Sequence, residues 1–443
     1  MPAHGPIALG LSLPLWSVLP FAGLLLSIAL FPLFAPSIWV RHYAKVCLGF
    51  GVPVAGFFLL RAPRELLNTV LEYVSFLVLL ASLFTISGGI LLRGTLRGAA
   101  GVNTAILALG AVLANVFGTT GASMLLIRPL LRANADRHRK AHVVVFFIFV
   151  VANIGGSLTP IGDPPLFLGY LRGVPFFWTL RAMGPLWAAA VGMVIGVFYL
   201  VDRRALAIEA AAGGDPDTAP AAEATESGAS MPASALGHPW PSAGEKRIPL
   251  SIEGKINLPL LGIVIGAVFL PTPFREIAMA AAAVVSAWKT PAKVREENEF
   301  TWHPIEEVAI LFAGIFATMI PALLILKARG AELGVVSPAH FFWATGVLSS
   351  FLDNAPTYLT FFSLAQGLGG PETVAGVSAP ILQAIGAGAV FMGANSYIGN
   401  APNFMVKAIA EEAGVRMPSF FGYMAWSCGI LLPIFALLTL IFF

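Results

Sequence analysis

The chain has 443 residues, of which 57% are hydrophobic and only 11% are charged, and its formal net charge is +3. A soluble domain carries about 25% charged residues, so this composition excludes an ordinary soluble enzyme or binding module. Apolar runs close to the ~20 residues that span a bilayer recur along the sequence. The sequence therefore predicts an all-α polytopic protein of the cell membrane, of the bacterial inner-membrane type, with the lipid bilayer as a partner.

The first predicted elements are two N-terminal spans, at residues 11–34 and 46–60, which together form a scaffold domain over residues 1–65. A third span, residues 72–92, opens the next predicted domain, residues 66–201. Basic residues lie mainly in the loops between such apolar segments, so the small positive net charge does not indicate a nucleic-acid partner.

Residues 101–133 are predicted to form a re-entrant helical hairpin. Two apolar pieces, each too short to cross comfortably, meet at Val116-Phe117-Gly118-Thr119. Such a structure is tolerated at membrane depth only where it is buried in protein or lines a cavity. A broken crossing over residues 143–171 and a span over 178–200 complete this domain.

The broken crossing contains three Gly, three Pro and one Asp between Ala152 and Phe167, at the depth of the membrane. Proline removes an amide donor and clashes with the preceding helical turn. A continuous helix is therefore not expected here, and the backbone is predicted to be unwound.

Residues 202–255 are predicted to be a disordered cytoplasmic linker. Ala, Pro, Gly and Ser dominate residues 205–244, which have few large apolar side chains to bury. Two linking spans follow within residues 256–299, which belong to the scaffold. The last predicted domain, residues 300–443, contains a span at 305–326, a second hairpin at 339–367, a broken crossing at 381–410 and a span at 419–443.

Residues 66–201 and 300–443 are predicted to be two copies of one repeat. The segment from Ile161 to Phe167 matches the segment from Ile398 to Phe404 at an offset of 237. The hairpin turns and the first spans of the two domains also align, at similar offsets. Two unrelated Gly/Pro kinks are the alternative explanation. Broken helices at corresponding places in two halves point to the binding site of a secondary transporter.

The predicted topology makes the second repeat inverted relative to the first, because an odd number of crossings separates their first spans. Nineteen of the 26 Lys and Arg residues then fall on one face, which the positive-inside rule assigns to the cytoplasm. Both termini are expected outside and the linker inside. The first hairpin enters from the cytoplasm and the second from outside, so their tips meet near the midplane.

Two acidic residues are the main candidates for chemistry, because ionisable side chains inside a membrane are costly. Asp163 lies in the first broken helix and Asp353 at the second hairpin turn, and no Lys or Arg falls in either turn or either break. The expected neutral ligands are hydroxyl and amide side chains in the same segments: Thr119, Thr120, Ser123, Asn153, Thr159, Asn354, Thr357, Asn395, Ser396 and Asn400.

The donor set predicts a sodium site at Asp353, Asn354, Asn153 and Asp163. Hydroxyls, amides and unwound carbonyls are hard oxygen ligands that suit Na⁺. A carboxylate in a poorly hydrated site can bind either H⁺ or Na⁺, and that competition is enough for exchange. The alternative is that Asp353 and Asp163 only cap the helices that follow them, since Asp and Asn are good N-caps.

Enzyme activity is not expected. The sequence has no HExxH pattern, no nucleophile elbow and no phosphate-binding loop. A channel would not need two inverted, hairpin-bearing halves. No cofactor is expected beyond the transported Na⁺ and H⁺, and no catalytic residue is assigned.

At these motifs the chain resembles the ion-transporter superfamily of secondary carriers, which includes divalent anion/sodium symporters, citrate carriers, arsenite pumps and NhaD-type sodium/proton antiporters. The first unwound segment, Asn153-Ile154-Gly155-Gly156 and then Ile161-Gly162-Asp163-Pro164-Pro165, looks like that of the family. Ser350-Phe351-Leu352-Asp353-Asn354-Ala355-Pro356-Thr357 looks like its second hairpin tip. The resemblance implies a homodimer formed through the scaffold and an elevator-like movement of the hairpin domain.

The hairpin tips depart from the dicarboxylate symporters of that superfamily, which carry a Ser-Asn-Thr triplet at both tips. Here the first tip contains Phe117-Gly118-Thr119-Thr120 and the second contains Asp353. An acidic tip would repel a di- or tricarboxylate. The sequence therefore favours sodium/proton antiport, with cation-coupled citrate or dicarboxylate symport as the alternative, because the overall pattern also resembles the citrate-transport branch.

Overall fold

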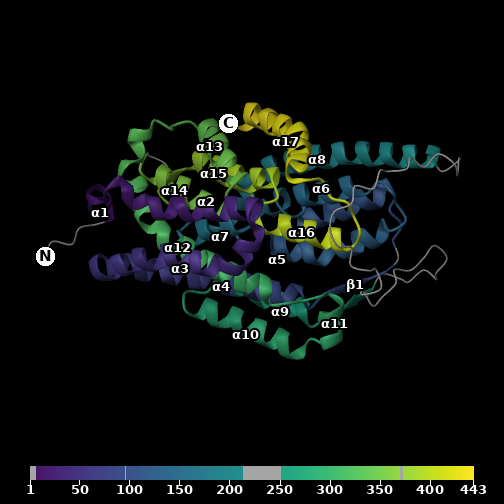
Figure 1. Cartoon of the computed structure of the whole chain (residues 1–443), viewed down its shortest axis with the longest axis horizontal. Helices are drawn as coiled ribbons and strands as arrows, with labels where there is room; N and C mark the ends of the chain where they lie inside the picture. The colour runs from purple at the N-terminus through teal and green to yellow at the C-terminus, as the bar shows by residue number, and fades with distance from the viewer. Residues whose placement is uncertain (1–5, 95, 213–250, 370–372) are drawn as a thin grey trace.

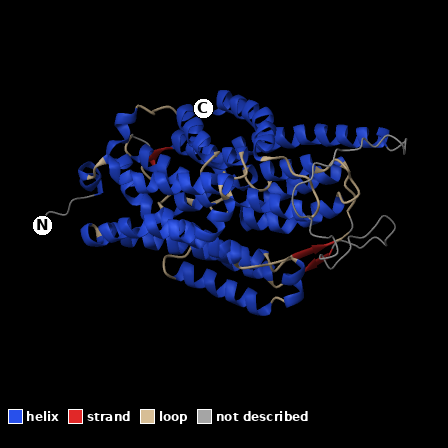
Figure 2. Ribbon diagram, viewed as in Figure 1, coloured by secondary structure: helices blue, strands red, loops and turns tan. Residues whose placement is uncertain are grey.

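A computed structural model describes residues 6–94, 96–212, 251–369 and 373–443 of the chain (Figure 1). Within these ranges the fold is helical, and the strands form only two short two-stranded sheets (Figure 2). The prediction of an all-α polytopic membrane protein is confirmed. Eight described segments are long and apolar enough to cross a membrane: Leu15–Pro32, Pro36–Arg61, Pro63–Ser87, Ala100–Ala133, Ala141–Leu158, Phe176–Ala211, His303–Glu332 and Phe420–Phe442.

Each helix of the N-terminal part has a proline at its first residue or next to it. After α1 (Pro6–Ser12) and η1 (Leu15–Val18) come α2 (Leu19–Phe34), α3 (Pro36–Arg61) and α4 (Pro63–Ser87). Proline suits the first helical position, because its missing N–H would have no partner there. Helix α3 begins at Pro36, ahead of the span predicted from residue 46, because its first turns, which include Arg41 and Lys45, continue into the apolar part of the helix.

Helix α4 packs against α12 (His303–Arg329) through aromatic side chains. The ring of Phe76 lies 4.8 Å from that of Phe312 and 5.9 Å from that of Phe316, measured between centroids. The Tyr73 hydroxyl donates to the Ala309 carbonyl at 2.9 Å. These contacts join the first spans of the two predicted repeats.

Helix α5 (Ala100–Ala133) is a hairpin whose turn lies at Gly118. Gly118 has φ 74° and ψ 159°, a conformation that other residues rarely adopt. A side-chain carbon placed on Gly110 would come 3.1 Å from Cδ1 of Leu126, 16 residues further along the chain. In a straight helix, 16 residues span about 24 Å, so the two arms must fold back on each other.

The second hairpin consists of α13 (Pro338–Ser349) and α14 (Asn354–Gln366), which follow η4 (Gly330–Leu333). Its arms pack against each other, and α14 also packs on α12. The side chain of Asp353 accepts a hydrogen bond from the Ala355 amide at 3.0 Å and so caps α14. The interpretation of Asp353 as a helix cap is therefore correct, whatever else this side chain does.

Both predicted broken crossings are interrupted by a short turn and an extended segment. The first is α6 (Ala141–Val150), η2 (Ile154–Leu158) and α7 (Pro164–Leu171). The second is α15 (Ala379–Met392), η5 (Gly393–Asn395) and α16 (Ala401–Glu412).

The backbone follows the same path through the two breaks. Thr159 and Ser396 are both extended, with φ/ψ of −131°/155° and −141°/168°. Asp163 and Asn400 are extended as well, at −146°/144° and −154°/138°. Each member of a pair lies 237 residues from the other, which is the offset that the sequence alignment requires.

The predicted linker, residues 202–255, needs correction at both ends. Helix α8 (Phe176–Ala212) continues beyond residue 202 because its alanine-rich end favours helix, and β2 (Ser251–Glu253) pairs antiparallel with β1 (Leu91–Arg93). Residues 213–250, which form most of the linker, lie outside the described residues.

The first linking span, predicted over residues 256–270, is shorter in the structure, whereas the second, predicted over residues 274–288, has almost the predicted bounds. Helix α9 (Asn257–Ala267) has 11 residues and α10 (Phe274–Lys289) has 16, below the ~20 of a straight crossing. They lie side by side along one edge of the molecule, before α11 (Ala292–Glu297) (Figure 1). As an antiparallel pair they add either two crossings or none, so the predicted inversion of the second repeat does not depend on them.

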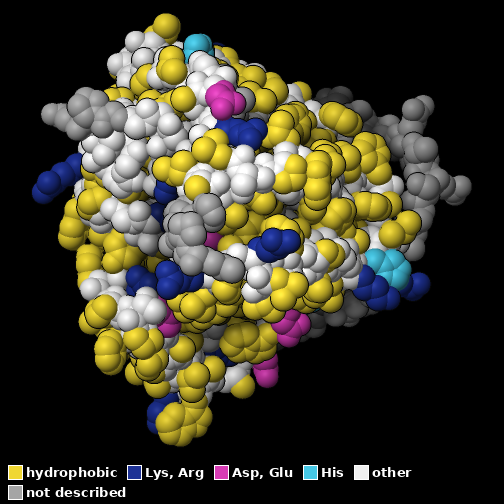
Figure 3. All heavy atoms as spheres, turned by 90° about the vertical axis from the view of Figure 1, so that its left-hand side faces the viewer, with side chains coloured by type: hydrophobic (Ala, Val, Ile, Leu, Met, Phe, Trp, Pro, Cys, Tyr) yellow, Lys and Arg dark blue, Asp and Glu magenta, His cyan; other side chains and the backbone are white. Residues whose placement is uncertain are grey.

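The broken helices lie at the centre of the molecule. Of the residues in Ala141–Leu158, 89% are buried, whereas only 17% are buried in the apolar 18-residue stretch of Pro36–Arg61. The remaining elements, β3 (Thr373–Val374), β4 (Val377–Ser378) and α17 (Phe420–Phe442), lie around this centre. At the end of the molecule that carries the N-terminus, hydrophobic side chains cover most of the surface and Lys and Arg are scattered (Figure 3).

Candidate ion-binding site

Asp163 occupies the residue before α7 and is only 1% exposed. Its side chain makes no capping hydrogen bond, because Pro164 and Pro165 have no amide hydrogen and the Leu166 amide donates to the backbone carbonyl of Asp163 at 3.1 Å. The alternative interpretation of Asp163 as a helix cap is therefore not supported. The carboxylate instead turns toward the two hairpin tips.

Three side chains donate hydrogen bonds to the Asp163 carboxylate, and each comes from a different element. Thr119 Oγ1 at the first tip donates to Oδ1 at 2.8 Å, and Asn354 Nδ2 at the second tip donates to Oδ2 at 2.5 Å. Asn400 Nδ2 in the second break donates to Oδ1 at 3.4 Å. One carboxylate thus joins both hairpins to both breaks.

The donors around Asp163 are all neutral. Among the described residues, no Lys, Arg or His lies within ion-pair distance of this carboxylate. Asp202, which is also fully buried, shows the ordinary arrangement instead: Arg137 Nη1 lies 2.6 Å and His142 Nε2 lies 2.8 Å from its Oδ1. Burying a carboxylate costs folding free energy unless a positive charge pairs with it. Arg137 pairs with Asp202 in this way, whereas no described residue does so for Asp163.

Three helices begin around Asp163, and prolines in their first turns reduce the number of amide donors. Asp163, Asp353 and Asn400 precede α7, α14 and α16 respectively, so the partial positive charges of three helix N-termini lie near the carboxylate. Prolines in these first turns, at positions 164, 165, 356 and 402, leave few N–H groups to bind an anion directly.

Asn153 connects the two breaks. Its Nδ2 donates to the Ile148 carbonyl at 2.8 Å and to Asn403 Oδ1 at 2.6 Å, and its Oδ1 accepts from Asn400 Nδ2 at 3.2 Å. The predicted residues Asn153, Asp163 and Asn400 therefore belong to one buried cluster, together with Thr119 and Asn354.

A family model described as "Putative citrate transport" matches residues 10–443 of the chain. The chain belongs to this citrate-transport family. No curated protein matches the chain. Membership of the family, together with the eight apolar helices, makes the chain a multi-pass membrane transporter. The predicted resemblance to the citrate-transport branch is confirmed.

Four of the twelve predicted site residues in this citrate-transport family member bond to nearby backbone or other polar groups. Thr357 Oγ1 donates to the Asp353 carbonyl at 2.9 Å, and Thr159 Oγ1 donates to the Asn115 carbonyl at 2.7 Å. Ser396 donates to the Ser350 carbonyl, and Asn395 Nδ2 donates to Ser350 Oγ at 2.9 Å. These side chains hold the tips and breaks in place without contacting Asp163.

Asp353 and Thr120 are the most exposed of the predicted residues near the tips, and both are half-buried. Asp353 lies next to Asn354 in the chain, yet only Asn354 contacts Asp163. The structure does not bring the two predicted aspartates into direct contact.

Several buried oxygen atoms near the tips have no hydrogen-bond partner. They are Oδ1 of Asn354, Oδ1 of Asn395 and Oγ of Ser123. Buried polar atoms without a partner are uncommon, and each one requires an explanation. Oxygens of this kind are available as ligands for a cation.

The sequence analysis missed Asn115 and Asn403. Asn115 Nδ2 donates to the carbonyls of Ala111 and Gly155, at 2.9 and 2.7 Å, and its Oδ1 accepts from the Leu158 amide at 2.8 Å. Asn403 Nδ2 donates to the carbonyls of Gly393 and Ser396, at 2.8 and 2.9 Å. The signal for both was available: each is an amide side chain inside an apolar segment, within a few residues of a Gly/Pro turn.

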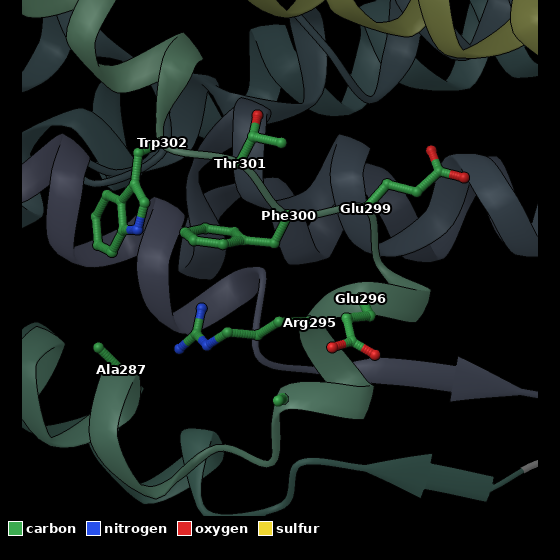
Figure 4. Close-up of a pocket in the computed structure, with 8 residues that line it drawn as sticks. Ala287, Arg295, Glu296, Glu299, Phe300, Thr301 and Trp302 are labelled. Carbon is green, nitrogen blue, oxygen red and sulfur yellow. The ribbon is translucent and has the colours of Figure 1, made fainter.

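A hollow lies elsewhere, between α10, α11 and the segment before α12 (Figure 4). The Arg295 guanidinium lies 4.7 Å from the centre of the Phe300 ring and extends toward Trp302, and the Glu299 carboxylate points away from it. Arg295 Nη1 donates to the Thr85 carbonyl at 3.1 Å. None of the predicted site residues lines this hollow, so it is not the candidate site.

Proposed function

We propose that this member of the citrate-transport family exchanges Na⁺ for H⁺ across the membrane, with Asp163 as the group that both ions share. One observation carries the proposal: a buried carboxylate receives hydrogen bonds from both hairpin tips and has only neutral donors around it. A poorly hydrated carboxylate without a cationic partner either holds a proton or binds a cation. Competition between the two ions for one site produces antiport.

The oxygen atoms around Asp163 support binding of a small hard cation. Rotation of the Asn354 amide by half a turn would direct its unpartnered Oδ1 toward the carboxylate in place of Nδ2. Thr119 Oγ1 and Asn153 Oδ1 are nearby oxygens in the same cluster. Carboxylate, amide and hydroxyl oxygens are the ligands that hard cations prefer. In this proposal Asp353 supplies a second carboxylate at the edge of the site.

Ion occupancy would control the two hairpins together. With Asp163 ionised, Thr119 and Asn354 both donate to it. A proton on one carboxylate oxygen, or a bound cation, would replace at least one of these hydrogen bonds. The hairpin tip that donated it would then lose a contact with Asp163. We propose that the hairpins and broken helices then move relative to the helices of the N-terminal scaffold, with elevator-type alternating access in a homodimer.

Cation-coupled symport of citrate or a dicarboxylate is the second candidate, and the family description favours it. In this alternative the helix N-termini near Asp163 hold substrate carboxylates, and the aspartates hold the coupling ion. The prolines in those first turns and the carboxylate already present argue against it, because few amide donors remain for an anion.

The proposal is tested with purified protein in liposomes that contain a pH-sensitive dye. Na⁺, Li⁺, K⁺ or citrate is added outside, one at a time. A pH change with Na⁺ or Li⁺ alone supports antiport. No response to cations alone, with a response to citrate plus a cation, contradicts antiport and supports the symporter alternative.

A further inference from the structure

We propose that Asn403 is a positioning residue, which sets the ion affinity of Asp163 through Asn153 and Asn400 although it touches neither the carboxylate nor the ion. This inference rests on the proposed function, since it concerns the same site. It adds a coupling between the two breaks: a hydrogen bond in the second break adjusts the ligands of a carboxylate in the first.

Asn403 is fully buried and performs two different tasks. Its amide nitrogen donates to the Gly393 and Ser396 carbonyls, which the break leaves without helical partners. Its Oδ1 faces the other way and accepts from Asn153 Nδ2 at 2.6 Å. The bonds from its nitrogen stay within the second break. The bond to its oxygen comes from Asn153 in the first break, 250 residues away in the chain.

Asn153 transmits the orientation of Asn403 to Asn400. Because its Nδ2 is held by Asn403 Oδ1 and the Ile148 carbonyl, its Oδ1 is fixed on the opposite side, 3.2 Å from Asn400 Nδ2. An amide can rotate freely only if its partners allow it, and here two acceptors fix the nitrogen end. The oxygen end of Asn153 is therefore a defined acceptor for Asn400.

The Asn400 amide has three acceptors for two hydrogens. They are the Ala152 carbonyl at 3.1 Å, Asn153 Oδ1 at 3.2 Å and Asp163 Oδ1 at 3.4 Å. Asn153 therefore competes with Asp163 for the same donor, and the contact with Asp163 is the longest. If Asn153 is released, Asn400 donates more fully to Asp163, which favours the ionised carboxylate and changes the balance between proton and cation.

Asn115 provides a matched comparison within the same molecule. It too is a buried amide that donates to two carbonyls near a break, and its oxygen also accepts a hydrogen bond. All of these partners belong to the first hairpin or the first break. Asn115 therefore performs the local task without the bond between the breaks.

The experiment compares Asn403→Leu with Asn115→Leu, since leucine has a similar branched shape, is somewhat larger, and makes no side-chain hydrogen bonds. The apparent affinity for Na⁺ and the maximal rate are measured in the liposome assay over a range of pH. Na⁺-dependent thermal stabilisation of the protein in detergent is measured in parallel. For Asn403→Leu we expect the apparent Na⁺ affinity to change by about tenfold with a displaced pH profile and a similar maximal rate, as for partners that orient a ligand. For Asn115→Leu, which loses only hydrogen bonds within the first hairpin and the first break, we expect a smaller change in the apparent Na⁺ affinity.

Equal affinities for the wild type and Asn403→Leu, or the same change in both variants, would overturn the inference. If Asn403→Leu does not fold, Asn403→Ser is used, because its hydroxyl can donate to a break carbonyl but is too short to reach Asn153. A wild-type protein that shows no cation-driven pH change but is stabilised by Na⁺ would contradict the proposed function alone, and the variants are then compared by thermal stabilisation. A wild type that binds no cation in either measurement overturns both proposals.

Discussion

Asn400 donates a hydrogen bond to Asp163, at 3.4 Å, although the two residues occupy equivalent positions in the two breaks. Equivalent positions that touch each other must lie next to the axis that relates the two copies. If residues 66–201 and 300–443 are inverted repeats, as proposed, that axis lies in the plane of the membrane. The contact would then place Asp163 near the midplane, where both hairpin tips can reach it. The two copies differ at this point, because one supplies the carboxylate and the other an amide.

Replacement of Asp163 by Asn should abolish Na⁺-driven proton movement. The side chain keeps its shape but can no longer release a proton or balance the charge of a bound cation. We expect the pH change in the liposome assay to fall to the level of empty liposomes, while the variant still elutes as a folded protein in detergent. Persistent exchange in Asp163→Asn would disprove the role of Asp163.

The matched control for this prediction is Asp202→Asn. Asp202 is equally buried and also joins several elements, but its partners are Arg137, His142 and Asn103, away from the hairpin tips. Removing its charge leaves Arg137 with only the longer contact to Glu209, at 3.4 Å, which should destabilise the protein by about 3 kcal/mol. Asp202→Asn should therefore lower the unfolding temperature more than Asp163→Asn does. Asp163→Asn should reduce the transport rate more than Asp202→Asn does.

The main elements near the site were predictable from sequence because Gly and Pro have strong local effects. The positive φ of Gly118 marks the first hairpin turn, and the adjacent prolines after Asp163 require the first break. The partners of each polar side chain were not predictable. Nothing in the sequence distinguishes Asn403, which bonds Asn153 across 250 residues, from an amide that binds its own backbone. The different environments of Asp163 and Asp353 likewise arise from tertiary packing.

Replacement of Asp353 by Asn should separate helix capping from ion binding. Asparagine caps helices about as well as aspartate, so the start of α14 and the stability of the protein should be retained. Because Asp353 is a proposed second carboxylate of the site, we expect the apparent Na⁺ affinity to fall. If both the exchange rate and the stability are unchanged, Asp353 acts only as a helix cap and does not bind the ion. Asp353→Ala, which loses the cap, should cost about 1 kcal/mol of stability in addition.

The proposed orientation places both termini outside the cell and the segment between the repeats in the cytoplasm. It follows from the distribution of Lys and Arg, since basic residues collect on the cytoplasmic side. A single cysteine introduced at Ser227, with Cys47 and Cys428 replaced by serine, should react with a membrane-impermeant maleimide only in inside-out vesicles. Labelling in intact cells would reverse the proposed orientation, and with it the sides from which the two hairpins enter.

Substitution of Gly162 or Gly399 by Ala should damage the two breaks in the same way. A side-chain carbon at Gly162 would collide with the Gly156 carbonyl, and one at Gly399 would collide with the Gly393 carbonyl, again 237 residues further along. Each break must then shift, at a cost of about 1–3 kcal/mol, which moves Asp163 or Asn400 away from the hairpin tips. We expect both variants to lose thermal stability and transport. Gly192→Ala is the control, since a carbon added there meets no atom within 4 Å. A loss at Gly162 without a comparable loss at Gly399 would show that the two breaks do not contribute equally to the site.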